Sequence, residues 1–148
     1  MAANWNKAQQ KAARTARWAV TMTKVRIRQV SARTRWQLIV FCGKAGGESV
    51  GIVDLLAVRK DHQKPKGGLR RGDALQIILI QVKGGAAALP TAEDWMRLRA
   101  VARRHRATGV LLAVWVKGRA VRFFRPTAKP TKGKLGWREV VDLRAVFR

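Results

Sequence analysis

The chain of 148 residues carries 32 lysines and arginines against 8 aspartates and glutamates, a formal net charge of +24 at neutral pH. Hydrophobic residues make up 47% of it, which excludes a disordered basic tail and is ordinary for a globular protein with a core of its own. The single cysteine, Cys42, excludes an intramolecular disulfide and a thiolate zinc cluster.

The excess of positive charge predicts a polyanionic partner, because like charges repel one another in the compact state. Nucleic acid is the commonest polyanion whose charge repeats along its length. The alternatives are a basic protein without such a partner and a protein on an anionic membrane. A membrane-surface protein concentrates its charge beside an apolar helix face, whereas this charge is spread along the whole chain. We therefore expect nucleic acid as the partner, no membrane, and a cytoplasmic, nucleoid-associated location.

Residues 1–30 form a basic N-terminal segment, and the first acidic residue of the chain is Glu48. Cations at helical spacing predict one or two helices over roughly residues 4–30. Those expected to contact phosphates are Lys7, Lys11, Arg14 and Arg17. The alternative is a solvated face on a helix that packs through its alanines and tryptophans, and both can hold because lysine and arginine stems cover apolar surface.

Three strands are predicted next, over residues 36–42, 50–59 and 74–83, and the third is apolar enough to be buried on both faces. The polar loop over residues 60–71 joins the second strand to the third. Its cations are also expected to bind nucleic acid. They are Lys60, Lys64, Lys66, Arg70 and Arg71.

A second helix is predicted after Thr91, a typical N-cap residue, with Glu93 and Asp94 in its first turn. Gly109 is expected to stop this helix, and the spacing of His105 is typical of a core histidine on its apolar face. Two further strands and a terminal helix complete the chain, which we expect to fold as a single domain. The two further strands are predicted over residues 110–116 and 120–124. The single domain then consists of a helical segment 1–30, a core 36–125, and a basic loop with the terminal helix 126–148.

Polar side chains enter two of the apolar strands, where burial without a partner is costly. Asp54 lies between Val53 and Leu55, and Gln81 and Lys83 lie near the end of the third strand. Gln81 and Lys83 are two residues apart, so their side chains are expected on the same face. If the second and third strands pair as a hairpin, Asp54 lies near them.

This set suits metal-dependent cleavage of a phosphodiester. A carboxylate holds Mg²⁺ through hard oxygen ligands, and the Gln81 amide or the Val82 carbonyl can share the ion. Lys83 can orient the attacking water or stabilise the transition state. The alternatives are a buried Asp54 paired with an arginine, and a Lys83 that simply extends to solvent.

At these residues the sequence resembles the PD-(D/E)XK nuclease superfamily, whose motif places Asp on one strand and Glu, Asp or Gln, any residue, then Lys on the next. Here the motif residues are Asp54 and Gln81-Val82-Lys83. The Gln variant is most similar to Mrr-type restriction endonucleases, and the small basic chain is similar to Holliday-junction resolvases. The resemblance covers roughly residues 10–125 in topology and three residues in motif.

The resemblance implies an α/β, restriction-endonuclease-like three-layer core with a mixed central β-sheet flanked by helices, in the order α-β-β-β-α-β. It implies a Mg²⁺-dependent (or Mn²⁺-dependent) endonuclease with DNA favoured over RNA, and branched recombination or repair intermediates are among its candidate substrates. Asp54, Gln81 and Lys83 would be catalytic, and Glu48, Asp54 and Gln81 would hold the metal. A homodimer is a further expectation, since cutting two strands often uses a symmetric dimer.

Three departures from the family pattern open a second hypothesis. Val53 replaces the usual proline, Gln81 replaces the usual acidic ligand, and the first helix has no glutamate. Glu48 either substitutes as a ligand or is only a turn residue, and the two interpretations are equally favoured. The second hypothesis is a non-catalytic DNA- or RNA-binding protein on a degenerate nuclease scaffold. Gly84 and Gly85, which follow Lys83, either admit a phosphate backbone or form a plain turn.

Overall fold

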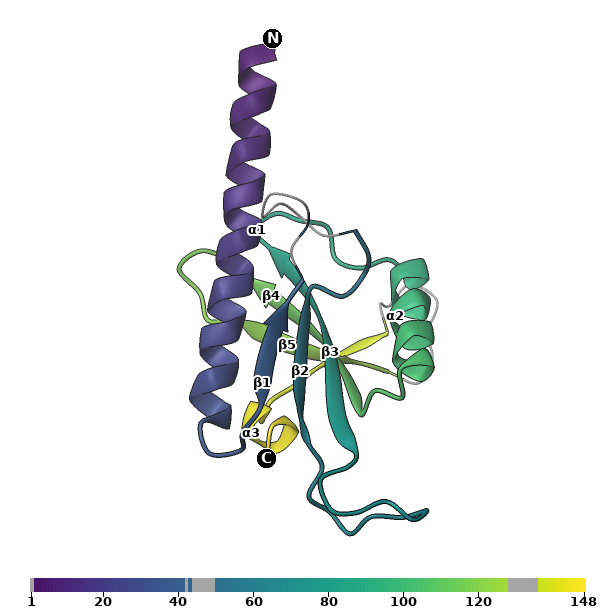
Figure 1. The fold of residues 1–148 in the computed structure, drawn as a ribbon. Helices are drawn as coiled ribbons and strands as arrows, with labels where there is room; N and C mark the ends of the chain where they lie inside the picture. Colours follow the sequence, from purple (N-terminus) through teal and green to yellow (C-terminus); the bar gives the residue numbers. More distant parts are fainter. Residues whose placement is uncertain (1, 42, 44–49, 128–135) are drawn as a thin grey trace.

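The computed structural model describes residues 2–41, 43, 50–127 and 136–148, with side chains from Asn6 onward. It is an α/β protein with a mixed sheet of six strands flanked by helices (Figure 1), which confirms the predicted class at this level. The elements are α1 (Ala2–Ser31), β1 (Gln37–Val40), β2 (Leu55–Lys60), β3 (Leu75–Gly84), α2 (Ala92–Arg104), β4 (Gly109–Trp115), β5 (Arg122–Pro126), β6 (Trp137–Glu139) and α3 (Leu143–Val146).

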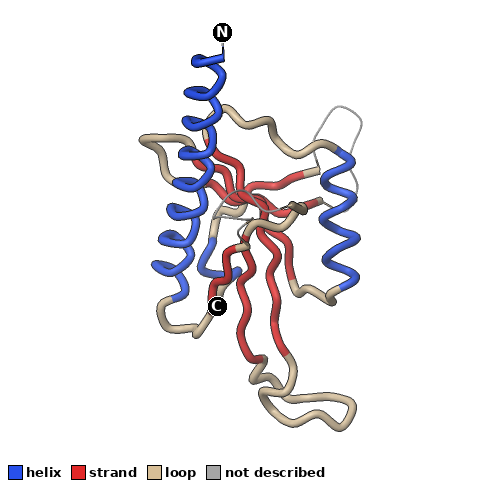
Figure 2. The backbone as a smooth tube through the Cα atoms, turned by 45° about the horizontal axis from the view of Figure 1, so that its top comes forward, coloured by secondary structure: helices blue, strands red, loops and turns tan. Residues whose placement is uncertain are grey.

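The strands lie in the sheet in the order in which they occur along the chain, from β1 to β6. β3 and β4 are parallel, and every other neighbouring pair is antiparallel. A parallel pair needs a crossover connection, and α2 supplies it. α1 and α2 lie on opposite sides of the sheet (Figure 2), so the chain forms helix, sheet and helix layers.

β3 is the centre of the sheet and is buried on both faces, as predicted. Ile80 belongs to the apolar cluster that includes Ile27 of α1, and the adjacent Leu79 belongs to the cluster around Leu98 of α2. Consecutive residues of a strand point to opposite faces. Each helix therefore covers one face of the same strand.

β2 and β3 form the expected antiparallel hairpin, with Leu55 opposite Ile80 and Lys60 opposite Leu75. The prediction that the second strand begins at residue 50 is wrong, because β2 begins only at Leu55. At Asp54 a side-chain hydrogen bond replaces the backbone pairing between β2 and β3, because the Asp54 Oδ2 accepts the Val82 N–H at 2.7 Å. This contact satisfies a donor of β3 where regular pairing stops.

α1 is much longer than the sheet it covers. Its 30 residues span about 45 Å at 1.5 Å per residue, against about 33 Å for the 10 residues of β3. Ala19, Thr23 and Ile27 form a buried stripe at a spacing of four residues, whereas residues 6–14 are all exposed. The N-terminal half of α1 therefore extends past the end of the sheet (Figure 1).

Gly84 and Gly85 mark the place where α1 crosses the end of β3. A Cβ on Gly84 would lie 2.8 Å from the Ala19 Cβ and 3.2 Å from the Thr15 carbonyl oxygen. A Cβ on Gly85 would lie 2.9 Å from Thr15 Cγ2, and its φ of +63° also favours glycine. The turn that was one of the two predicted alternatives is present, since the Ala87 N–H donates to the Gly84 carbonyl at 3.2 Å. The two glycines also allow close packing of the helix, which was not predicted.

α2 begins as predicted and ends earlier than predicted. The Thr91 hydroxyl accepts the Asp94 N–H and the Asp94 carboxylate accepts the Thr91 N–H, which makes a capping box. The helix ends at Arg104 with His105 as its C-cap, and His105 is exposed rather than in the core. Gly109 is the first residue of β4 instead of a helix stop.

The C-terminal part adds a strand that the sequence analysis did not predict. β6 has 3 residues, too few to show an alternating pattern, and it pairs with β5 at the edge of the sheet. Arg122 donates two hydrogen bonds to the Glu139 carboxylate, at 2.9 and 2.8 Å. The predicted terminal helix is present as α3, capped by the Asp142 side chain.

In the described part of the chain, no helix has the length and apolar character needed to cross a membrane.

Replacement of Gly84 by alanine tests the contact between α1 and β3. We expect Gly84→Ala to lower the free energy of unfolding by about 1–3 kcal/mol, because the neighbouring atoms belong to a packed helix. Gly109→Ala is the matched control, since its Cβ would lie an ordinary 3.7 Å from Ile78, and should change the value by no more than about 1 kcal/mol. Equal midpoints in urea unfolding would contradict the close contact.

The ion pair at the sheet edge predicts a pH dependence. The hydrogen bonds from Arg122 lower the pKa of Glu139 below its ordinary value. The pair therefore stabilises the β5–β6 pairing at neutral pH, and this contribution is lost as the pH falls through the lowered pKa. A carboxyl-carbon NMR titration should show the low pKa in the wild type and an ordinary pKa in Arg122→Gln. An unchanged Glu139 titration in that variant would refute the pairing in solution.

Candidate functional site

Asp54 is held at the junction of β2 and β3. Its backbone N–H donates to the Ile80 carbonyl at 3.0 Å, and its carboxylate accepts the Val82 N–H at 2.7 Å. These two contacts lie on either side of Gln81 along β3. Asp54 is half-buried. The two hydrogen bonds fix its carboxylate beside β3, the strand that carries the other two motif residues.

Gln81 is the most buried member of the set, with 5% of its surface exposed. Its Oε1 is buried and has no hydrogen-bond partner among the described residues. An unsatisfied buried oxygen is unfavourable by about 1–3 kcal/mol. A glutamine that held only a structural position would be expected to use this oxygen, so Gln81 has an acceptor that the described residues leave unsatisfied.

Lys83 shares a face of β3 with Gln81, as predicted. Val82 packs with the cluster beneath α1, and Gly84 faces Thr15 and Ala19 of that helix. By alternation, Gln81 and Lys83 face the side of α2. Lys83 is partly exposed, so its side chain is accessible to solvent on the same face of β3 as Gln81.

The structure thus brings together Asp54, Gln81 and Lys83, whereas Glu48 lies outside the described residues. Within the described ranges, no three His, Cys, Asp or Glu side chains group as a metal site would require. The donors that do fit Mg²⁺ are the Asp54 carboxylate and the unsatisfied Gln81 Oε1, since the ion prefers oxygen ligands and usually keeps several waters.

The cations predicted to bind nucleic acid fall into two groups at opposite ends of the sheet. Those of α1 lie on or near the exposed half that extends beyond Gly84. Those of the β2–β3 loop lie at the other end of β3 (Figure 2), away from Asp54. The first group, which shares the end of the sheet with the candidate site, is Lys7, Lys11, Arg14 and Arg17; the second is Lys60, Lys64, Lys66, Arg70 and Arg71.

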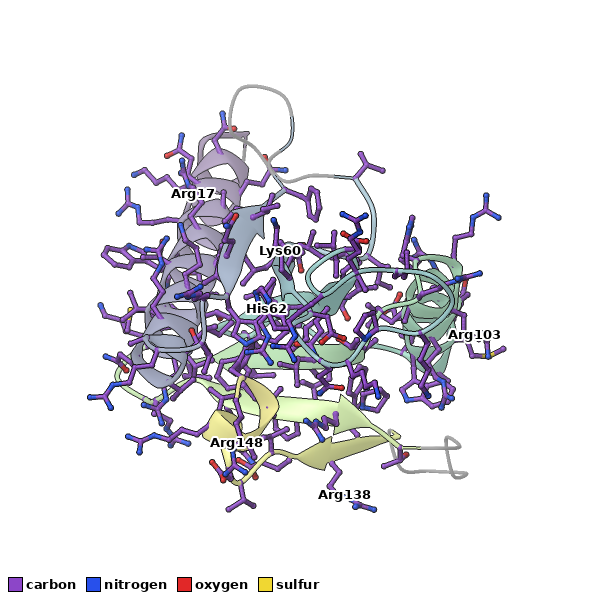
Figure 3. All side chains as sticks on the ribbon, turned by 60° about the horizontal axis from the view of Figure 1, so that its bottom comes forward. Arg17, Lys60, His62, Arg103, Arg138 and Arg148 are labelled. Carbon is purple, nitrogen blue, oxygen red and sulfur yellow. The ribbon has the colours of Figure 1, made fainter. Side chains whose placement is uncertain are left out.

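Most described carboxylates accept backbone N–H groups, and the 8 acidic residues of the chain are too few to balance its 32 lysines and arginines. Asp61 accepts the Gln63 N–H and Asp73 accepts the Arg70 N–H. The ion pairs between described residues are Arg97 with Asp94 and Arg122 with Glu139. Cationic side chains project on all sides of the molecule (Figure 3), so its field is strongly attractive to polyanions.

Two residues near these regions were not identified from the sequence. Phe41, 44% exposed, lies beside the site, where its N–H donates to the Asp54 carbonyl at 3.1 Å. Arg59 lies at the opposite end of β2, with its guanidinium 4.5 Å from the centre of the Trp36 ring. A polar residue at the end of an apolar strand was the signal that singled out Lys83, and the same signal would have found Arg59.

No protein-family model matches the sequence, and no curated protein is significantly similar to it.

The hydrogen bond between Asp54 and Val82 can be tested through stability. Asp54→Ala leaves the Val82 N–H without its acceptor and should lower the free energy of unfolding by about 1–3 kcal/mol. Asp54→Asn keeps a carbonyl oxygen at the same place and should have a clearly smaller effect. Chemical denaturation of both variants provides the measurement. The hydrogen bond is not formed in solution if the two variants unfold alike.

Proposed function

We propose that the protein is a nucleic-acid-binding, Mg²⁺-dependent endonuclease that cleaves phosphodiester bonds of DNA, on a restriction-endonuclease-like core of the PD-(D/E)XK type. The observation that carries the proposal is the hydrogen bond from the Val82 N–H to the Asp54 carboxylate. It places the carboxylate beside the segment of β3 that runs from Gln81 to Lys83. The element order from α1 to β4, with β3 and β4 parallel, supports it because the core of that superfamily has the same order.

The proposed chemistry assigns one role to each side chain. Asp54 and Gln81 would hold Mg²⁺ through oxygen atoms. The chemistry that the ion supplies when bound is neutralisation of phosphate charge and a lower pKa for a water molecule. Lys83 would donate to the scissile phosphate as negative charge develops on it.

The surface charge supports the choice of substrate. The exposed half of α1 is free of acidic residues and lies at the same end of the sheet as Asp54 and Lys83. Lys83 lies on the opposite face of the sheet from α1, so a strand bound along this half would reach the site around the end of the sheet. The homodimer, the nucleoid-associated location and the preference for branched DNA stay predictions.

A second candidate is a DNA- or RNA-binding protein without catalysis. Two observations favour it. The position of the usual acidic ligand is Gln81, and α1 carries no carboxylate that could complete a metal site. This candidate predicts salt-dependent binding without Mg²⁺-dependent cleavage.

Cleavage distinguishes the two candidates. In a plasmid-nicking assay with Mg²⁺, Lys83→Ala should lower the rate by about 10²–10³-fold, as the loss of one stabilising donor does in other sites. Lys60→Ala removes a lysine at the far end of the same hairpin and should leave the rate within a few-fold. Linear, branched and single-stranded substrates define the preferred structure. Equal nicking by the wild type and Lys83→Ala, or none by either, would leave the binding candidate.

Gln81 gives a readout that does not depend on turnover. Gln81→Glu places a second carboxylate beside Asp54, so the variant should unfold at a lower temperature than wild type in EDTA and regain stability with Mg²⁺. Gln81→Leu, which supplies no oxygen ligand, should not respond to Mg²⁺. An equal Mg²⁺ response of the two variants would rule out a metal ion at this position.

The contribution of α1 to binding can be measured through salt. Replacement of Lys7, Lys11 and Arg14 by glutamine should reduce the slope of log affinity against log salt by about 0.9 for each phosphate that the helix no longer neutralises. The loop variant with Lys64, Lys66 and Arg70 replaced is the control of equal charge. If α1 guides DNA to the site, only the α1 variant loses cleavage at low salt, and equal losses would contradict this role.

A further inference from the structure

A pocket of about 460 Å³ opens at the end of the sheet opposite Asp54 and Lys83. Its walls come from the end of β2, the starts of β3 and β4, and the end of β5. Gln76 lines it, and lies about 23 Å along β3 from Lys83 at 3.3 Å per residue. The volume falls within the range of about 300–1,000 Å³ that is typical of small-molecule sites.

The rim of the pocket is cationic. Arg59, Arg125 and Arg148 line it together with Gln63, and no aspartate or glutamate is among its described lining residues. Figure 3 views the molecule from this end, with Lys60 and His62 near the centre and Arg148 beside α3. Three guanidinium groups around one opening favour an anionic ligand, and arginine suits phosphate because its N–H groups form a planar fork.

Arg59 is fixed in place before any ligand arrives. Its Nε donates to Gln76 Oε1 at 2.6 Å, and its terminal nitrogens donate to the carbonyls of Thr34 at 3.1 Å and Arg148 at 2.5 Å. Its guanidinium also lies over the Trp36 ring. These bonds use three of its five N–H groups, so a positioned cation retains donors that it can offer to the pocket.

The rest of the lining combines polar and apolar residues. Gln76 and Thr108 are polar, and the apolar residues include Pro126, Val146 and the buried Ile78 and Leu111. A free inorganic anion would gain nothing from such a surface, whereas a ligand with a flat, weakly polar body and a charged group matches both parts. Nucleotides have this combination, with a base to place against apolar side chains and a phosphate for the arginines.

We infer that this pocket binds a nucleotide, with its phosphate held by Arg59 and Arg125. The ligand is either a free mononucleotide or the phosphorylated end of a nucleic-acid strand, since both offer the same chemistry. Gln63 joins the pocket to the basic β2–β3 loop, which gives the loop cations a role at this end of the sheet. The inference does not depend on the nuclease proposal.

Trp36 provides a local reporter of binding. Its indole N–H donates to the Phe147 carbonyl at 3.1 Å beside Arg59, so its NMR resonance should shift when the pocket fills. The resonance is assigned by its disappearance in Trp36→Phe. The probes are deoxyadenosine 5′-monophosphate, deoxyadenosine, and a short single-stranded oligonucleotide with and without a 5′-phosphate, all in EDTA.

Deoxyadenosine 5′-monophosphate should shift the Trp36 resonance and deoxyadenosine should not. Arg125→Gln should weaken the nucleotide about tenfold or more, as expected when a hydrogen bond to a charged group is removed. Arg119→Gln, which removes an exposed arginine from the turn between β4 and β5, should bind as wild type. Arg59→Lys should also bind weakly, because lysine lacks the planar fork.

The two sources of the ligand give different results. A strand end is the ligand if the 5′-phosphorylated oligonucleotide binds more tightly than both the mononucleotide and the unphosphorylated strand. A free nucleotide is the ligand if the mononucleotide binds at least as tightly as either. Asp54→Asn should keep this binding in full, so the result is separate from the nuclease site. An unmoved Trp36 resonance at millimolar nucleotide, or equal weakening by Arg119→Gln and Arg125→Gln, would overturn the inference.

Discussion

The burial of β3 on both faces is the constraint that organises this molecule. Ile80 packs under α1 and Leu79 under α2, so each helix needs the strand to keep one register. A shift of one residue would exchange the two faces and place Gln81 and Lys83 beneath α1. The positions of the polar residues near the end of β3 therefore follow from the packing of its apolar residues.

Asp54 connects this constraint to chemistry. Its carboxylate accepts an N–H that regular pairing with β2 would otherwise satisfy, so the hairpin opens at a defined point. A carboxylate is thereby held at the rim of the core without a long loop to position it. The same contact gives Asp54 a structural role, and only substitutions that keep the hydrogen bond can separate that role from the proposed metal binding.

The parts of the fold that have strong local patterns in the sequence were predicted correctly. The helical character of residues 4–30, the apolar 74–83 strand and the Thr91 cap follow from local patterns, and the structure confirms them. Whether residues 4–30 form one helix or two was left open, and the structure has one. Contacts between side chains that are far apart in the sequence could not be predicted from local patterns. The late start of the second strand depends on Val82, 28 residues beyond Asp54, and the role of Gly84 depends on Thr15 and Ala19 of the first helix. β6 was not predicted because three residues are too few to show an alternating pattern, and their strand conformation depends on pairing with β5.

The exposed half of α1 has little to stabilise it apart from its own backbone. It lacks an acidic residue in its first turn that would favour the helix dipole, and its cations repel one another. The buried half of the same continuous helix supplies the nucleus on which it forms. Under the proposed function, phosphates bound along the exposed half would relieve the repulsion between its cations and stabilise the helix. Polyanion binding and helix formation would then be coupled thermodynamically, so that each favours the other.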